Sequence, residues 1–338
     1  MTLAVIWFIL VFVLLAGYAV LDGFDLGVGA LHLFSKDENE RRISLNSIGP
    51  VWDGNEVWLL TAGGALFAAF PAVYATVFSG FYVALMLVLA ALMFRAVAME
   101  FRGKVDSAAW RSVWDVAFSV SSILLPVLFG VALGNVLRGV SLAADGTYSG
   151  TFLGLLNPYA ILIGVLTLVT FVMHGAIFLA GKTDGRMQLR VVKVALRAWL
   201  AFVVLYVLTT LATGMAAPSL YHHDGINYGA WIFMVFIVTS VIALPNLLRA
   251  KRFRTAMFAS CSLVGSLMGL AGCGLFPRLL PSITDPAASL TITNASSTPR
   301  TLFAMLVIAL IGMPLVILYT AFIYRAFHGK VVLSEDSY

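Results

Sequence analysis

Nine long apolar segments constrain this chain more than any other feature of its sequence. About 20 apolar residues are needed to cross the hydrocarbon core of a membrane, and segments of roughly this length recur along the whole chain. The predicted spans are residues 3–34, 50–72, 75–98, 114–136, 158–180, 197–217, 228–247, 256–276 and 302–326. Hydrophobic residues make up 61% of the chain and charged residues only 11%, whereas soluble domains contain about 25% charged residues. The sequence therefore predicts an all-α, multi-pass membrane protein.

The basic residues predict how these spans are oriented. Of the 21 Lys and Arg residues, 18 fall in alternate connections or in the C-terminal tail, and the opposite side holds only Arg138, Arg278 and Arg300. Because cytoplasmic loops of membrane proteins are enriched in Lys and Arg, we expect the N-terminus outside and the C-terminus in the cytoplasm. The same rule accounts for the net charge of +5, so no nucleic-acid partner is expected. The first segment lacks a basic leader and a cleavage site, and it is expected to remain as the first span.

Two similar phrases suggest a weak internal repeat. Residues Tyr18–Gly29 and Thr170–Gly181 each end a span that runs from outside to inside, and both are rich in small residues. They would make residues 1–136 and 158–276 two parallel four-helix units, with residues 302–326 as an extra helix. Nothing in the sequence suggests a soluble domain, so all 338 residues are expected to form one transmembrane domain.

Six acidic side chains lie in the apolar segments or at their ends. They are Asp22, Asp25, Asp53, Glu56, Glu100 and Asp115. A carboxylate in hydrocarbon is costly unless it is paired, protonated or turned toward a polar path. The expected orientation puts all six in the cytoplasmic half of the membrane or at its inner surface, so we look for function there.

Four of these acids form two pairs with the same spacing, Asp22 with Asp25 and Asp53 with Glu56. A spacing of three residues puts both acids of a pair on one face of a helix. The sequence therefore predicts a polar cluster that conducts protons or binds a polar headgroup. The alternative is a buried network that only holds helices together, with Arg95 as the counter-charge.

Tryptophans flank the second acidic pair. Trp52 precedes it, and Trp58 follows it about a turn and a half inside the span, where its ring could line a cavity. Most of the other tryptophans lie near predicted span ends, which is typical of an interfacial aromatic belt.

His174 is the only histidine well inside a predicted span. A haem ligand needs an axial partner or a free iron face, and the remaining histidines lie at span ends, in an outer loop or in the tail. We expect His174 to be a hydrogen-bonded helix contact, and no metal site is predicted. The adjacent His222 and His223 are a weak metal-binding signal. Cys261 and Cys273 are about 18 Å apart along one helix, so they cannot bond to each other within it.

Several motifs, taken together, resemble subunit II of cytochrome bd-type quinol oxidases. They are Asp22-Gly-Phe-Asp-Leu-Gly-Val-Gly29, the run from Asn46 to Pro71 that contains Trp52-Asp-Gly-Asn-Glu-Val-Trp58, Phe78-Ser-Gly-Phe-Tyr82, Leu156-Asn-Pro158 and Asn294-Ala-Ser296. The resemblance covers nearly the whole chain and keeps the order of the motifs.

The resemblance implies a subunit of a respiratory oxidase that oxidises quinol and reduces O2 to water. It implies that heme b and heme d belong to a partner, the haem-bearing subunit I, with which this chain would form a heterodimer. A small single-helix accessory subunit, and a structural quinone or lipid on this chain, are further expectations. The complex would lie in a bacterial or archaeal cytoplasmic membrane.

The resemblance also implies roles for individual residues. Asp53 would belong to a proton path from the cytoplasm, with Glu56, Asp25 and Asp22 in support, and Trp58 would belong to an oxygen-access route. The residues expected to support this cluster are Trp52, Arg95, Glu100 and Asp115. From the residues alone, a proton-coupled secondary transporter and a purely structural scaffold remain alternatives.

Overall fold

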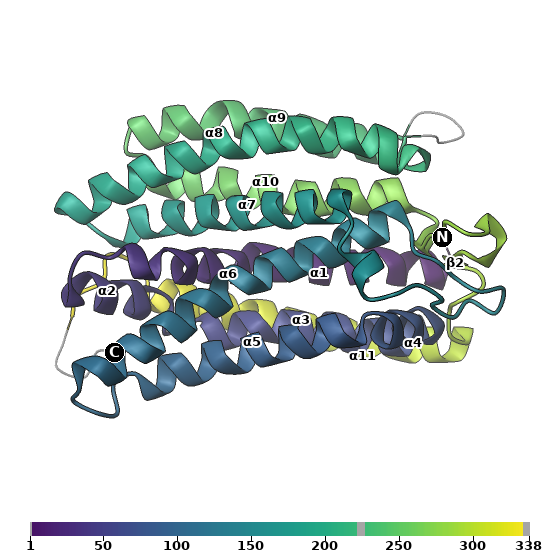
Figure 1. Ribbon diagram of the computed structural model, residues 1–338, viewed down its shortest axis with the longest axis horizontal. Coiled ribbons are helices and arrows are strands. Elements are labelled where there is room, and N and C mark those ends of the chain that lie inside the picture. The colour runs from purple at the N-terminus through teal and green to yellow at the C-terminus, as the bar shows by residue number, and fades with distance from the viewer. Residues whose placement is uncertain (1, 222–226, 334–338) are drawn as a thin grey trace.

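The computed structural model describes residues 2–221 and 227–333, and these residues are mostly helical (Figure 1). The α-helices are α1 (Leu3–Leu31), α2 (Glu38–Ile48), α3 (Trp52–Ala69), α4 (Pro71–Gly80), α5 (Tyr82–Phe101), α6 (Ala108–Arg138), α7 (Pro158–Lys182), α8 (Gly185–Ala216), α9 (Tyr228–Arg249), α10 (Phe253–Leu275) and α11 (Pro299–Ala326). The short elements are the 3₁₀ turns η1 (His32–Phe34), η2 (Leu153–Leu155), η3 (Pro218–Leu220) and η4 (Pro286–Ala288), and the strands β1 (Arg278–Leu280) and β2 (Leu290–Thr291).

The helices confirm a multi-pass membrane protein. Within the described residues, eight helices are long and apolar enough to cross a membrane, namely α1 and each helix from α5 to α11. Helix α3 occupies the second predicted span but is less apolar, because Asp53, Asn55 and Glu56 fall in its first turns. The predicted total of nine crossings is reached only if α3 is counted as a crossing together with these eight helices.

Two stretches differ from the sequence prediction. The predicted span 75–98 is divided, because α4 ends at Gly80 and α5 begins at Tyr82; Phe81 between them has φ −100° and ψ 19°. Hydropathy does not mark this break, since the residues on both sides are apolar. The predicted connection 35–49 contains the helix α2, whose first turn is capped by the side chain of Asp37.

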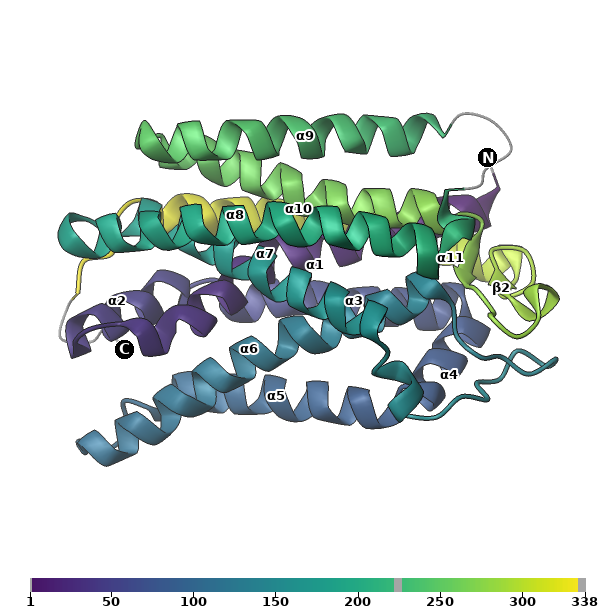
Figure 2. The same cartoon turned by 45° about the horizontal axis from the view of Figure 1, so that its top comes forward.

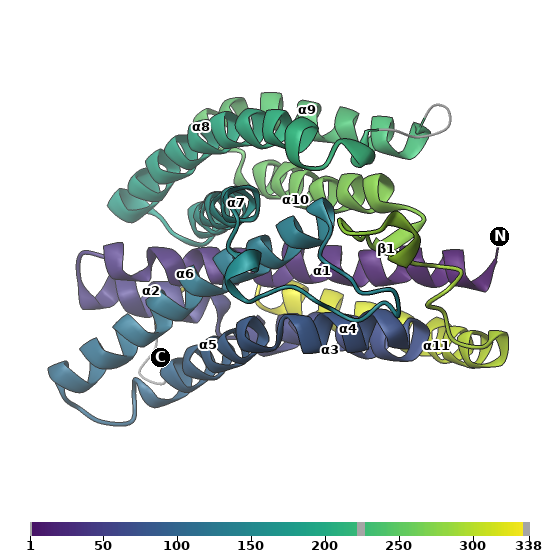
Figure 3. The ribbon, with the colours of Figure 1, turned by 45° about the vertical axis from the view of Figure 1, so that its right-hand side comes forward.

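The long helices run roughly side by side in tiers (Figures 1 and 2). Helices α8 and α9 form one side of the molecule, α7 and α10 lie next to them, and α3, α5 and α11 form the opposite side (Figures 1 and 3). Helix α1 passes through the middle and packs against α3, α6, α7 and α10 (Figure 3). The first helix is therefore the central element on which the others assemble.

The crossing of α1 and α7 depends on two glycines. A Cβ atom on Gly27 would overlap the carbonyl oxygen of Phe171, and one on Gly175 would overlap the backbone of Gly27 and Val28. Small residues let helix backbones approach closely in lipid, and here the two backbones touch. This contact holds the acidic end of α1 close to His174.

The two ends of the bundle have different coverings. At the end where α1 begins, β1 pairs antiparallel with β2, and the indole of Trp7 donates a hydrogen bond to the carbonyl of Leu302 near the start of α11. At the other end, Lys182 at the end of α7 donates to the carbonyl of Phe327, just beyond α11. Helix α1 thus begins and α11 ends at opposite ends of the bundle.

Candidate functional site

A buried arginine joins two of the predicted acids. Arg95 of α5 donates from Nη2 and Nη1 to the two carboxylate oxygens of Asp22, at 2.6 and 2.9 Å. Its Nη1 also donates to Glu56 Oε1 at 3.0 Å. Arg95 and Asp22 are 0% exposed. Arg95 is thus paired with two of the predicted acids, and the contacts tie α1, α3 and α5 together at this point.

Asp25 lies one turn further along α1 and has a different set of neighbours. Its Oδ2 accepts a hydrogen bond from Asn55 Nδ2 at 2.7 Å, and the Oδ1 of Asn55 accepts one from the hydroxyl of Tyr324 at 3.0 Å. Asn55 also donates to the carbonyl of Leu21 at 3.2 Å. The other oxygen of Asp25 is buried without a hydrogen-bond partner in the described structure. We call Asp22, Asp25, Glu56, Arg95, Asn55 and Tyr324 the polar cluster.

The charges of the polar cluster determine what it can do chemically. Three carboxyl groups share a single guanidinium, so full ionisation would leave two uncompensated negative charges in a largely buried place. Uncompensated charge is costly in a low-dielectric interior; uptake of one proton would halve it and uptake of two would remove it. Such a cluster can exchange protons, and it can equally act as a fixed link between helices.

Asp53 does not join the polar cluster through a direct hydrogen bond. It lies in the first turn of α3 with its side chain exposed, and among the described residues its carboxylate accepts only from the backbone N–H of Gly54, at 2.7 Å. Glu56, one turn later, faces Arg95 and is partly buried. Asp53 is therefore placed at the outer edge of the cluster, where it faces away from this chain.

The two tryptophans beside the acids are partly buried. Trp58 lies against α1, where a Cβ atom on Gly17 would overlap its ring, and its indole nitrogen has no acceptor in the described structure. Trp52 begins α3 and packs against the apolar core around Phe24 and Val28. Both rings therefore contribute to the packing of α3 on α1.

Asp115, predicted to support the polar cluster, belongs instead to a second ionic group. Its oxygens accept from His32 Nε2 at 2.5 Å, Arg102 Nε at 2.6 Å and Arg41 Nη1 at 3.0 Å. Arg102 also donates to Glu38 at 2.9 Å. Burial disfavours the charged form of Arg102, but Asp115 and Glu38 outweigh it and raise its pKa. This Asp115 group fastens α2 and the α5–α6 connection to the end of α1.

Glu100 is exposed on α5. The hydrogen bonds described above for the polar cluster and for the Asp115 group do not include it. The six acids thus divide into three in the polar cluster, one in the Asp115 group and two on the surface. Residues that the sequence reasoning missed are Asn55, Tyr324, His32, Arg41 and Arg102. Asn55 could have been noticed, because it is a buried amide between the two predicted acids of α3.

His174 is a helix contact, as predicted. Its Nε2 faces the carbonyl of Val20 at 2.9 Å and must donate to it, so Nδ1 accepts from the hydroxyl of Ser260 at 2.7 Å. Both ring nitrogens are therefore used within the protein. Cys261 and Cys273 are not bonded to each other. His222 and His223 lie outside the described residues.

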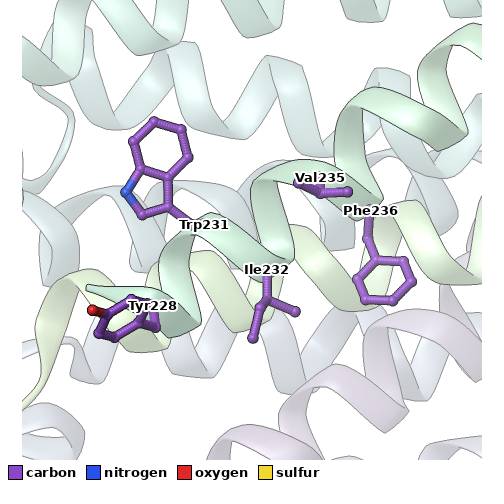
Figure 4. Close-up of a pocket in the computed structure, with 5 residues that line it drawn as sticks. All are labelled: Tyr228, Trp231, Ile232, Val235 and Phe236. Atoms are coloured by element: carbon purple, nitrogen blue, oxygen red, sulfur yellow. The ribbon is translucent and has the colours of Figure 1, made fainter. Parts of the chain in front are cut away.

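A shallow hollow of about 300 Å³ lies on α9, on the side of the molecule opposite α3 (Figures 1 and 4). Its lining residues come from one face of that helix: Tyr228, Trp231, Ile232, Val235 and Phe236. Apolar side chains dominate this surface, which is typical of a face in contact with lipid chains. The polar cluster lies elsewhere, around α1, α3 and α5.

Known proteins resemble this chain over nearly its whole length. The sequence profile of the family described as cytochrome bd terminal oxidase subunit II matches residues 3–327. Cytochrome bd-I ubiquinol oxidase subunit 2 of Escherichia coli (strain K12) is 39% identical, over 98% of this chain and 95% of its own. Cytochrome bd ubiquinol oxidase subunit 2 of Bacillus subtilis (strain 168) is 37% identical, over 98% of this chain and 97% of its own.

The fold has a counterpart among solved structures. A chain in the structure of bd oxidase from Geobacillus thermodenitrificans superimposes with a TM-score of 0.77 and 21% identity, covering 97% of this chain and 99% of that one. At that identity the structural match supports the fold alone. The family profile and the two relatives each match almost the entire chain, so this protein belongs to the cytochrome bd terminal oxidase subunit II family.

Proposed function

We propose that this chain is the subunit of a bacterial cytochrome bd quinol oxidase that supports, but does not itself ligate, the haems. The observation that supports this most directly is family membership over nearly the full chain. The complex would oxidise quinol and reduce O2 to water in the cytoplasmic membrane. Family membership favours this function over the proton-coupled transporter.

The one histidine well inside a predicted span, His174, does not fit a haem. Both of its ring nitrogens are hydrogen-bonded to protein groups. An axial ligand needs a free ring nitrogen facing the iron. We therefore assign heme b and heme d to subunit I. Redox chemistry belongs to those haems when they are bound, and this chain supplies packing and protonatable groups.

The surface formed by α3, α5 and α11 is the best candidate for contact with subunit I. Helix α11 is the least buried of the membrane-spanning helices, and a Cβ atom on Gly54, Gly63 or Gly64 of α3 would meet nothing within 4 Å. Small residues allow close packing between membrane helices, and none of the described residues packs against these three glycine positions. Asp53 is exposed at the end of the same helix, so a partner packed there would cover it.

Asp53 is then the group through which protons from the cytoplasm would pass toward the partner. The orientation that places it on the cytoplasmic side follows from the distribution of basic residues. Glu56 lies between Asp53 and the buried Arg95–Asp22 pair, so it can exchange protons or stabilise charge at that point. Trp58, partly buried beside α1, is proposed to line the oxygen route.

A scaffold role for part of the cluster has its own support. The Arg95–Asp22 pair is fully buried and bidentate, which suits a fixed link between α1 and α5 better than a group that repeatedly changes charge. We therefore separate the two roles, with Asp53 and Glu56 in proton supply and the Arg95–Asp22 pair in assembly.

The decisive experiment is Asp53→Asn in the assembled complex. We expect full haem content, slower oxygen consumption with quinol and slower proton uptake from the cytoplasmic side. Asp106→Asn is the control, since Asp106 is also an acidic residue and its side chain is 99% exposed in the α5–α6 connection. Unchanged turnover and proton uptake in Asp53→Asn would reject the proton role, and reduced haem content alone would favour the scaffold.

An internal duplication would explain the packing pattern. Helix α1 packs on α3 as α7 packs on α8, and α5 packs on α6 as α9 packs on α10. This correspondence supports two four-helix units with α11 as the ninth crossing. A structural quinone or lipid, and a small accessory subunit, remain proposals to be tested on the purified complex.

A further inference from the structure

One face of helix α8 carries cationic side chains in its first part and apolar side chains in the rest. Arg186, Arg190, Lys193 and Arg197 follow one another at intervals of four, three and four residues, so they lie on one face. The same spacing continues with exposed apolar residues on that face: Leu200, Val204, Leu208, Leu211 and Met215. We call the first set the basic stripe and the second the apolar stripe.

The change from basic to apolar coincides with the expected edge of the membrane. From Ala198 to the end of α8 at Ala216, the helix rises about 28 Å at about 1.5 Å per residue, which matches a hydrocarbon core of about 30 Å. Arg197 then lies at the boundary, and Lys193 lies about 6 Å further out, within the headgroup layer. Trp199 lies two residues beyond Arg197, and tryptophan is enriched at membrane interfaces.

Most of the charge on the basic stripe is not neutralised within residues 2–221 and 227–333. Arg190 is paired with Glu40 of α2. Among the described residues, Arg186, Lys193 and Arg197 have neither an ion pair nor a hydrogen bond from their side chains. The nearby acid Asp184 is already paired with Lys330 at 3.4 Å. The exposed Lys193 and Arg197 are therefore available to an anion from outside the chain.

The position of α8 leaves this face open. Helix α8 packs against α7 and α9 and lies on the opposite side of the molecule from α3, α5 and α11 (Figures 1 and 3). The proposed contact with subunit I would therefore leave α8 facing the bilayer. A cationic zone at headgroup depth above a continuous apolar zone matches the two halves of a phospholipid.

We propose that this face of α8 is a binding site for an anionic phospholipid of the inner leaflet. The headgroup phosphate lies against Lys193 and Arg197, and the acyl chains lie along the apolar stripe from Leu200 to Leu211. The choice of leaflet rests on the proposed orientation of the chain; the site itself depends only on the two stripes. This location is independent of the polar cluster.

A general preference for positive charge on the cytoplasmic side would explain basic residues without any specific site. The two explanations predict different effects on lipid binding when the same number of charges is removed from the basic stripe or from another cytoplasmic connection. Lys193→Gln with Arg197→Gln removes one lysine and one arginine from the basic stripe. Lys251→Gln with Arg252→Gln removes the same two charges from the exposed α9–α10 connection at the same end of the protein.

The test is native mass spectrometry of the purified complex titrated with phosphatidylglycerol. A cation near the surface contributes about fivefold to the affinity for an anionic lipid, so we expect Lys193→Gln/Arg197→Gln to weaken binding by about 25-fold. The Lys251→Gln/Arg252→Gln control should stay within about twofold of the wild type, and Arg197→Lys should keep its affinity because it keeps the charge. Unchanged haem spectra and yields would show that the variants are folded.

Three outcomes would overturn the proposal. Equal losses in the two double variants would indicate general surface charge. No loss in Lys193→Gln/Arg197→Gln would show that the basic stripe does not bind the lipid. Inorganic phosphate that displaces bound phosphatidylglycerol when the two are present at equal concentration would indicate a simple anion site without acyl-chain binding.

Discussion

Arg95 and Asp22 form a two-point ion pair that is closed to solvent: both carboxylate oxygens of Asp22 accept from the guanidinium, at 2.6 and 2.9 Å, and both side chains are 0% exposed. The pair joins α1 to α5, and Glu56 of α3 approaches the same guanidinium. Removing one partner of a buried pair is much more damaging than removing both, because it leaves an uncompensated buried charge.

The first prediction concerns this pair. Arg95→Met leaves Asp22 and Glu56 without a cation, and we expect the complex to lose about 3–5 kcal/mol of stability, seen as low yield and early thermal unfolding. The double variant Asp22→Leu/Arg95→Met should recover most of that loss. The measurement is thermal unfolding of the purified complex, followed by haem absorbance. A double variant as unstable as Arg95→Met would mean that the charge imbalance is not the cause.

The second prediction concerns the amide that connects Asp25 to Tyr324. Tyr324→Phe removes one hydrogen bond and should cost about 1 kcal/mol, whereas Asn55→Leu also leaves Asp25 without its donor and should cost about 2–4 kcal/mol. Because the two residues share a hydrogen bond, their effects should not add in the double variant. Thermal unfolding of the single and double variants gives the coupling. Strict additivity would show that the Tyr324–Asn55 bond contributes nothing.

The third prediction concerns the contact between α1 and α7. Gly27→Ala would place a methyl group on the carbonyl of Phe171, so we expect the two helices to separate and the complex to fail to assemble. Gly265→Ala is the control, because its Cβ would meet Val20 at an ordinary 3.8 Å. Assembly is measured as co-purification of the haem subunit. Normal assembly of Gly27→Ala would show that this crossing can widen without consequence.

The fourth prediction concerns the Asp115 group. Asp115→Asn leaves His32, Arg41 and Arg102 beside a neutral side chain, so mutual repulsion and lost hydrogen bonds should loosen α2 and the α5–α6 connection. We expect faster proteolysis in that connection and a loss of about 2–4 kcal/mol. Arg111→Gln breaks only the exposed pair with Asp106 and should change stability by at most about 1 kcal/mol. Equal protease sensitivity in the two variants would contradict the structural role of Asp115.

The polar cluster shows how far sequence reasoning extends. The rarity of acids in apolar segments points to Asp22, Asp25 and Glu56, and the structure brings these three together around Arg95 and Asn55. The same reasoning placed Asp53, Glu100 and Asp115 beside them, although Asp53 and Glu100 are exposed and Asp115 has its own cations. Helical spacing shows which residues share a face, but it does not show toward which neighbour that face turns.

The sequence by itself determined the class of protein, because long apolar segments with few charges can only be accommodated in a membrane, and its motifs indicated the family. Only the tertiary structure decided which acids meet which cations. Asp22 meets Arg95 across 73 residues of chain, and Asn55 meets Tyr324 across 269. Lipid and neighbouring helices are equally apolar, so hydropathy does not distinguish a lipid-facing side from a packed one. The rotation of each helix, and with it the partner of each buried charge, is set by backbone contacts such as that of Gly27 with Gly175.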